Sequence, residues 1–292
     1  NVDALKDDSL KRYNEVGPEN FSRINYAMLA IFVASIILWI TESVPSYLTS
    51  LLVIITMVLT GVTTEKVAYA QLGHPVMWLN ILSFVLASML VTTKVAKRFA
   101  LWFVNKFGKN AVGIFFSFIV INIVLSVFIS ATTAKATILL PIFMVIAAIY
   151  GATSEKKNNF GRNIVLQNLF QINISASGFI TGSGANLLAG SLIAGAMGWS
   201  MFGYQDWFIA AFPLCIILII IGWVVGTKII FPMKPDEQIP QIEGGMARLK
   251  QEYSLLGKMT MNEYKSIAIF LVVLALWATD KQHGISQTAV AF

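Results

Sequence analysis

Residues 111–150 read AVGIFFSFIVINIVLSVFISATTAKATILLPIFMVIAAIY, which is two apolar runs, 111–129 and 136–150, joined by a short polar segment, 130–135. Basic clusters flank this stretch on both sides, at 94–109 and 156–162. The positive-inside rule places such clusters in the cytoplasm, so both ends of the stretch point inward. The stretch is therefore either two full membrane spans or a re-entrant helical hairpin, whose tip is tolerated only where protein buries it or where it lines a cavity.

The composition of the whole chain sets the class of protein. Of its 292 residues, 57% are hydrophobic and 12% are charged, whereas a soluble domain has about 25% charged residues. A chain of this length could not bury so much apolar surface in one core, which excludes a soluble enzyme and a disordered chain. One cysteine (Cys215) and two histidines (His74 and His283) are too few for a disulfide framework, a zinc cluster or a Cys/His nucleophile system. The basic residues lie in loops between apolar runs, so the net charge of +6 does not indicate a nucleic-acid partner.

Further apolar runs complete an all-α, polytopic pattern, because they do not alternate as barrel strands do. We expect membrane spans at 24–41, 48–62, 76–92 and 207–227, a discontinuous span at 163–198, and another span that starts at 265–279. Met246, Leu249, Tyr253 and Leu256 recur at helical spacing, which predicts an amphipathic helix over 245–257 on the inner membrane surface. Counting spans places the N-terminus outside, and no initiator Met is present, so we expect the chain to be part of a longer protein.

The discontinuous span contains a second break. Residues 178–186 read GFITGSGAN, which is too rich in glycine and hydroxyl residues for a continuous helix. Unwound backbone in the membrane usually lines a site, where helix N-termini offer N–H donors to anions and free carbonyls hold cations. The candidate substrate-binding residues are the small and polar ones at the two breaks: Ser130, Ala131, Thr132 and Thr133 at the first, and Gly182, Ser183, Gly184 and Asn186 at the second, with the hydroxyl of Thr181 beside them. The alternative is that small residues merely permit tight helix packing.

Lys135 is the only charged residue between positions 110 and 154, and a lone charge within the membrane indicates function by default. At the polar tip, beside hydroxyls and helix ends, its ammonium predicts an anion site. The alternative is that the side chain extends along a membrane interface. Gln167, Gln171 and Ser175 follow at one-turn intervals and form a polar stripe. This stripe is either the wall behind the tip or a packing surface joined by amide hydrogen bonds.

Four short patterns in this chain match those of one family of membrane carriers. ITESVP (40–45) followed by LTGV (59–62) resembles a TEAxP…GV opening, and TKVAKRFALW (93–102) is similar to TGLAKRIALW. SAT (130–132) followed by LPI (140–142) resembles a Ser-Asn-Thr hairpin tip, and GSGANLL (182–188) resembles a GTxPNL loop. Together these patterns resemble the divalent anion/Na⁺ symporter (DASS) family, and the resemblance runs from about residue 35 to residue 292.

The resemblance implies the first inverted repeat of an ion-transporter-type elevator fold, with a re-entrant hairpin and a discontinuous helix. It implies a polar N-terminal segment (1–23), scaffold helices (24–110), a transport domain (111–232), a cytoplasmic loop with an interfacial helix (233–262) and the incomplete start of a second repeat (263–292). It also implies a homodimer in membrane lipid that carries small di- or tricarboxylates, with a second hairpin tip that this chain lacks. In the family the two breaks form half of the substrate and Na⁺ sites. If the chain is a symporter, Na⁺ is therefore expected near Ser130, Thr132, Gly182 and Asn186.

Two departures from the family pattern lead to the functional hypothesis. Ala131 stands where the family tip has Asn, which removes an amide that contacts substrate and weakens the expectation of a C4-dicarboxylate preference. Lys135 lies within a few residues of the expected Na⁺ position, where a fixed ammonium can replace a bound cation.

We therefore expect a secondary carrier, not an enzyme, in a multi-pass form in the bacterial plasma membrane. Its predicted substrates are small dicarboxylates of the succinate, malate and 2-oxoglutarate class, moved by anion exchange. One alternative is a Na⁺-coupled dicarboxylate or citrate symporter on the same fold, and another is a passive anion channel. The hypothesis includes no catalytic residue, no cofactor and no resident metal, apart from Na⁺ in the symporter alternative.

Overall fold

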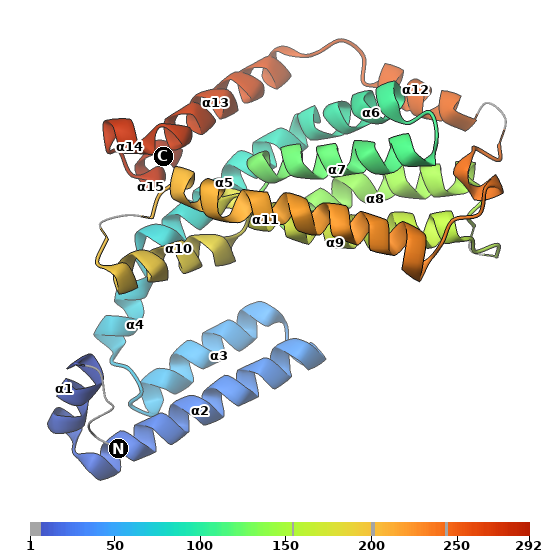
Figure 1. Ribbon diagram of the computed structural model, residues 1–292. Coiled ribbons are helices and arrows are strands. Elements are labelled where there is room, and N and C mark those ends of the chain that lie inside the picture. Colours follow the sequence, from blue (N-terminus) through green and yellow to red (C-terminus); the bar gives the residue numbers. More distant parts are fainter. Residues whose placement is uncertain (1–6, 154, 200–201, 243–244) are drawn as a thin grey trace. The chain divides into compact units, whose positions relative to one another are not determined.

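The computed structural model describes residues 7–153, 155–199, 202–242 and 245–292 (Figure 1). All regular secondary structure in these residues is helical, as the apolar runs predict. The chain divides into two compact units, Asn1–Met77 and Trp78–Phe292. The boundary falls inside helix α5 (Pro75–Thr92), within the segment 24–110 for which the resemblance implies one set of scaffold helices.

The first unit consists of α1 (Asp7–Val16), α2 (Pro18–Thr41), α3 (Ser46–Leu59) and α4 (Glu65–Leu72), followed by the first residues of α5. Pro18 begins α2, where the missing N–H of proline leaves no intrahelical bond unmade. α2 packs along α3, and the guanidinium of Arg12 in α1 donates to the carbonyl of Val62 at 2.7 Å. Most large apolar side chains of α2 and α3 are exposed, as expected for helices whose solvent is lipid.

The second unit holds the rest of α5 and all later helices. In chain order these are α6 (Val95–Phe107), α7 (Ala111–Phe128), α8 (Thr132–Ile149), α9 (Asn159–Ser177), the 3₁₀ turn η2 (Ile180–Gly182), α10 (Gly184–Met197), α11 (Tyr204–Val225) with a π-helical turn after it (Gly226–Ile230), a 3₁₀ turn (Asp236–Gln238), α12 (Gly245–Leu255), α13 (Met261–Ala278), α14 (Asp280–His283) and α15 (Gln287–Ala291). The predicted spans agree with these bounds to within a few residues. One difference matters: α8 begins at Thr132, so Lys135 lies in its first turn and not in a non-helical tip.

Helix α9 is the centre of the second unit and packs against α7, α8 and α11 (Figure 1). Buried aromatic rings join these helices. The ring of Tyr150 stacks on Phe160 with centroids 3.9 Å apart, and Phe118 meets the edge of Phe143 at 4.2 Å. Each ring is nearly or fully buried, and such pairs add to the free energy of burial. This packing fixes α7, α8 and α9 together, and therefore positions both chain breaks.

Five helical stretches in the described residues are long and apolar enough to cross a membrane: Pro18–Thr41, Glu65–Thr92, Thr132–Ile149, Tyr204–Ile230 and Met261–Ala278. Three shorter apolar helices, Ser46–Leu59, Ala111–Val127 and Gly184–Met197, accompany them. An apolar stretch of about 18 residues or more, with few charges, indicates a membrane span. The chain is therefore an integral, multi-pass membrane protein.

Two amphipathic helices differ from the sequence-based expectation. The basic stretch 94–109 contains α6, whose buried face is Ala96, Ala100, Leu101 and Val104. The predicted helix at 245–257 is present as α12, but Leu249 on its apolar face is fully buried against protein, because α12 packs on α6 and α8. Helical periodicity shows that one face is apolar; it does not distinguish a lipid surface from a neighbouring helix.

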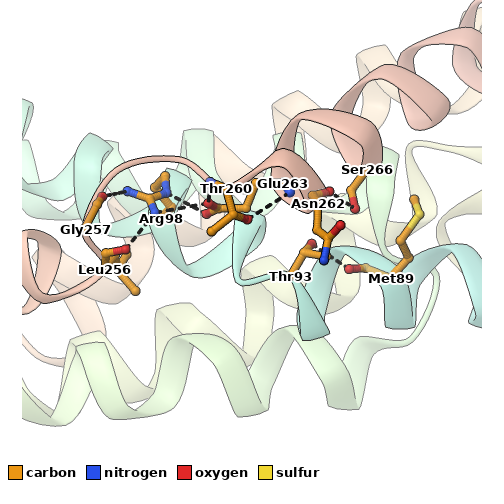
Figure 2. A network of polar contacts seen from close by, with 9 residues as sticks. All are labelled: Met89, Thr93, Arg98, Leu256, Gly257, Thr260, Asn262, Glu263 and Ser266. Carbon is orange, nitrogen blue, oxygen red and sulfur yellow. Dashed lines mark hydrogen bonds and ion pairs between the residues drawn. The ribbon is translucent and has the colours of Figure 1, made fainter.

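Arg98 of α6 ties this helix to the loop before α13 and to α13 itself (Figure 2). Its guanidinium donates to Glu263 at 2.7 Å and to the carbonyls of Gly257 (2.9 Å) and Leu256 (3.1 Å). The carboxylate of Glu263 also accepts from the N–H of Thr260 at 2.6 Å, in a capping box that begins α13. The hydrogen bond to Glu263 raises the pKa of Arg98 above its ordinary value, so the guanidinium stays charged.

Removing this guanidinium should destabilise the fold. Arg98→Gln leaves the carboxylate of Glu263, only 3% exposed, without its cationic partner, and we expect a loss of about 2 kcal/mol in the free energy of unfolding. Lys97→Gln is the matched control, because its ion pair with Glu252 is exposed and such pairs contribute little. Thermal unfolding of the purified full-length protein measures both variants. Equal changes in Tm would contradict a stabilising role for the Arg98 network.

Candidate substrate-binding site

The first break is the turn between α7 and α8. Only residues 129–131 are non-helical, and Ile129 and Ala131 have extended backbone angles. Ser130 between them is 6% exposed, so the turn is buried in protein. Ala131 is the N-cap of α8 and has no side chain that could cap the helix. The first N–H groups of α8 therefore remain open donors at the positive end of an 18-residue helix.

The second break lies between α9 and α10. The side-chain amide of Asn186 donates to the carbonyls of Ala176 (2.9 Å) and Phe179 (2.8 Å), which joins the start of α10 to the end of α9. Ser183 caps α10 by accepting from the N–H of Asn186. Gly182 is required by close approach, because a Cβ there would lie 2.1 Å from the carbonyl oxygen of Ala176. Local hydrogen bonds thus hold the unwound backbone in place.

The two breaks meet at one small cavity. Ser130 of the first break and Thr181 of the second line it together with Ser83 of α5. Its volume is about 10 Å³, roughly that needed for one water molecule. The three hydroxyl oxygens are buried and make no hydrogen bond in the described structure, although the Tyr204 hydroxyl lies near that of Thr181. Unpartnered buried hydroxyls are costly, so a water molecule, a small ion or one polar atom of a ligand suits this position.

Helix α5 contributes two residues that the sequence analysis missed. Ser83 lines the cavity, and Asn80, one turn away, lies against the second break. A Cβ on Gly184 would come within 2.4 Å of the Asn80 amide nitrogen, so glycine at this position permits the contact. The amide oxygen of Asn80 is buried without a partner. Two polar residues three positions apart in the apolar run 76–92 were the signal that could have identified them.

Lys135 lies beneath the first break and not within it. Its side chain is fully buried, and Nζ donates to Ser126 Oγ at 2.8 Å and to the Ile172 carbonyl at 3.3 Å. Ser126 in turn shares a 2.7 Å hydrogen bond with Ser175 of α9. Among the described residues, no carboxylate lies within ion-pair distance of this ammonium. The site therefore contains a buried lysine side chain with no anionic partner among the described residues.

The polar stripe on α9 packs through amide hydrogen bonds. Gln171 donates to Gln167 at 3.4 Å and accepts from Asn122 of α7, also at 3.4 Å. Gln167 donates to the Gly222 carbonyl of α11 at 2.9 Å. Of the two alternatives left open by the sequence, these bonds match the packing surface. The stripe ends at Ser175, which shares a hydrogen bond with Ser126, and Ser126 accepts a hydrogen bond from Lys135.

The remaining candidate residues occupy the rim of the two breaks. Ala131 and Thr132 are half-buried at the start of α8, and Thr133 is exposed. Ser183 and Gly184 are half-buried at the start of α10. In the described part of the chain no hydrogen bond joins residues 130–135 to residues 181–186. The relation between the two breaks is that Ser130 and Thr181 line the same cavity.

The polar groups at the two breaks are suited to binding a ligand. Within the described ranges, no three His, Cys, Asp or Glu side chains gather as ligands for a metal ion. The groups at the breaks are hydroxyls, amides, open N–H donors and one ammonium. Such groups can hold a carboxylate, and the oxygens among them can coordinate Na⁺.

Comparison with known proteins identifies the family. The profile described as "Sodium:sulfate symporter transmembrane region" matches residues 17–292. Dicarboxylate transporter 1, chloroplastic, of Spinacia oleracea is 28% identical over 282 residues, covering 94% of this chain and 48% of that protein. The putative malate transporter YflS of Bacillus subtilis is 27% identical, covering 90% and 55%, and the sodium-dependent dicarboxylate transporter SdcS of Staphylococcus saprophyticus is 28% identical, covering 90% and 50%.

The chain spans about half the length of these curated relatives, which are transporters by name and not enzymes. The family profile, in contrast, matches nearly the whole chain and includes both breaks, α5 and Lys135. The chain therefore belongs to the sodium:sulfate symporter family, which is the divalent anion/Na⁺ symporter family that its motifs resemble.

Proposed function

We propose that this chain forms part of a secondary active transporter of small dicarboxylates, of the succinate, malate and 2-oxoglutarate class, which works by anion exchange. The observation that supports this proposal best is the cavity where Ser83, Ser130 and Thr181 leave three hydroxyls without partners. The open N-terminus of α8 adds N–H donors and a positive dipole end, which favour an anion. The names of relatives from Spinacia oleracea and Bacillus subtilis support a dicarboxylate in this role.

Exchange is proposed because of Lys135. Its buried ammonium, which has no carboxylate partner in the part of the chain that the structure describes, would provide the positive charge that a coupling cation otherwise supplies. It hydrogen-bonds to Ser126 near the end of α7, three positions before the first break, so its charge would act electrostatically on a carboxylate bound at that break. A fixed charge of this kind removes the need for Na⁺ in the binding step.

The second candidate function is Na⁺-coupled symport of a dicarboxylate or citrate on the same fold. One observation favours it: a cavity for a single small guest, lined by three hydroxyl oxygens, suits a Na⁺ ion as well as a substrate oxygen. The relative from Staphylococcus saprophyticus is named as sodium-dependent. Of the residues near which the resemblance places Na⁺, Ser130 lines this cavity, whereas Thr132, Gly182 and Asn186 do not. In this alternative Lys135 would serve only the fold.

The proposed architecture follows the same residues. We propose that α7 and α8 form a re-entrant hairpin, because the turn that joins them is buried and shares a cavity with residues of α5, η2 and α13. An elevator movement of the 111–232 segment, a homodimer, and residence in a bacterial plasma membrane belong to the proposal as well. The second half of the binding site would come from outside this chain, whose relatives are about twice its length.

The unpartnered hydroxyls of Ser83 and Ser130 provide the first test of the proposed binding site. Ser83→Ala and Ser130→Ala should each raise the apparent KM for succinate about tenfold in proteoliposomes, because each removes one contact to the guest. Stability should be unchanged, since neither hydroxyl has a partner in the protein. Ser117→Ala is the control, because this buried hydroxyl of α7 bonds only within its own helix. Unaltered transport in both site variants would exclude these two hydroxyls from the binding site.

Lys135 provides the second test. We expect counterflow of labelled succinate by the full-length protein to continue without Na⁺ and to require a dicarboxylate on both sides of the membrane. Lys135→Met should reduce this Na⁺-independent exchange at least about tenfold and leave the protein folded, because an unpaired buried charge is itself costly. Lys109→Met, at an exposed position, is the control. Strict Na⁺ dependence of the unaltered protein would replace exchange by the symport alternative.

A further inference from the structure

A groove on the second unit lies apart from the cavity at the two breaks. It runs between α8, α9 and the loop that joins them, and its volume is about 490 Å³. Its long wall is an apolar stripe on α9, formed by Val165, Leu166 and Leu169, which faces Met144 of α8. These four side chains are 37–57% exposed, which is unusual for neighbouring large apolar residues outside lipid. The wall therefore suits an apolar occupant.

One end of the groove is basic. Arg162 begins the same stripe, three residues before Val165, and Lys157 of the preceding loop also lines the groove. Both side chains are exposed, and Lys156 lies next to them in the sequence. The sequence places this loop at the cytoplasmic surface, because the cluster 156–162 is one of the two that flank the hairpin.

The basic end keeps its positive charge available. The guanidinium of Arg162 lies 5.5 Å from the ring of Phe231, which holds it at the rim without neutralising it. The nearby carboxylate of Glu237 is almost fully buried and accepts from the backbone N–H groups of Asn159 and Lys234, so its hydrogen bonds are made elsewhere. The amide of Asn158, also at the rim, is used by backbone groups of the loop and of α9.

We propose that this groove binds an anionic phospholipid of the cytoplasmic leaflet. The headgroup phosphate lies between Lys157 and Arg162, and an acyl chain lies along Val165, Leu166 and Leu169. From Arg162 to Leu169 the stripe extends about 10 Å along the helix, which matches the first part of an acyl chain below its headgroup. Basic pockets between membrane helices on the cytoplasmic side are suited to acidic headgroups.

The transported anion fits this groove poorly. A small dicarboxylate has no long apolar part and needs donors for two carboxylates, whereas the groove beyond its basic end offers apolar side chains. A lipid matches both ends of the groove, since it combines an anion with a hydrocarbon chain. This inference depends on the chain spanning a membrane and not on exchange or symport.

Native mass spectrometry of the full-length protein in detergent tests the proposal, with phosphatidylglycerol, phosphatidylcholine and soluble glycerol phosphate as probes. Phosphatidylglycerol should remain bound in preference to phosphatidylcholine, and glycerol phosphate should not displace it. The double variant Lys157→Gln, Arg162→Gln should lose about 25-fold in apparent affinity for phosphatidylglycerol, at about fivefold for each basic residue. Both residues are exposed, so the fold should not depend on them.

Two further variants separate this groove from other lipid contacts. Val165→Trp fills the apolar part without changing charge, and it should weaken phosphatidylglycerol binding as well. Lys106→Gln, Lys109→Gln removes two exposed basic residues of the other cytoplasmic cluster and should leave binding unchanged. Equal loss in this control pair, full binding in the Lys157 and Arg162 variant, or full binding in Val165→Trp would each overturn the proposal.

Discussion

Hydrocarbon offers no hydrogen bonds to the backbone, and this constraint decides where the chain can be interrupted inside a membrane. At the second break the amide of Asn186 donates to the carbonyls of Ala176, in the last turn of α9, and of Phe179, just after it, and Ser183 caps α10. Local hydrogen bonds therefore satisfy backbone polar groups at this break. The hydroxyls of Ser83, Ser130 and Thr181 stay unpartnered nearby, so the fold does not need them. Under the proposed function, the division between satisfied and unsatisfied polar groups separates the residues that hold the break from those that would face a ligand.

The sequence predicted the helices and the two breaks, because long apolar runs and clusters of glycine and hydroxyl residues are local signals. It could not predict which polar side chains meet. Asn80 and Ser83 are single polar residues in an apolar run, and the groups they approach, Gly184 and Thr181, are about a hundred positions away in the chain. Helix α6 was not predicted for another reason. Its basic residues indicated a cytoplasmic loop, although its buried positions recur with helical spacing.

The sequence predicted Lys135 at a non-helical tip, whereas in the structure it lies in the first turn of α8. The segment 130–135 is uniformly small or polar, and this composition does not show where a helix begins. Only residues 129–131 are needed to reverse the chain, and the residues after them extend the helix. Lys135 thereby joins the first turn of α8 and reaches Ser126 and Ile172 on the neighbouring helices. The polar stripe on α9, which ends at Ser175, then provides part of the surroundings of this ammonium.

Under the proposed function, this position links binding to translocation. Lys135 Nζ donates to Ser126 near the end of α7, three positions before the first break begins. At an effective dielectric constant of about 20, two opposite unit charges at ~6 Å attract by about 3 kcal/mol. A bound dicarboxylate gains this attraction, whereas the empty carrier moves an uncompensated charge through the membrane, which is unfavourable. The empty carrier therefore crosses slowly, and return occurs mainly with a second anion bound. Under the proposed function, a positive charge on Lys135, which has no carboxylate partner among the described residues, thus favours exchange over net uptake.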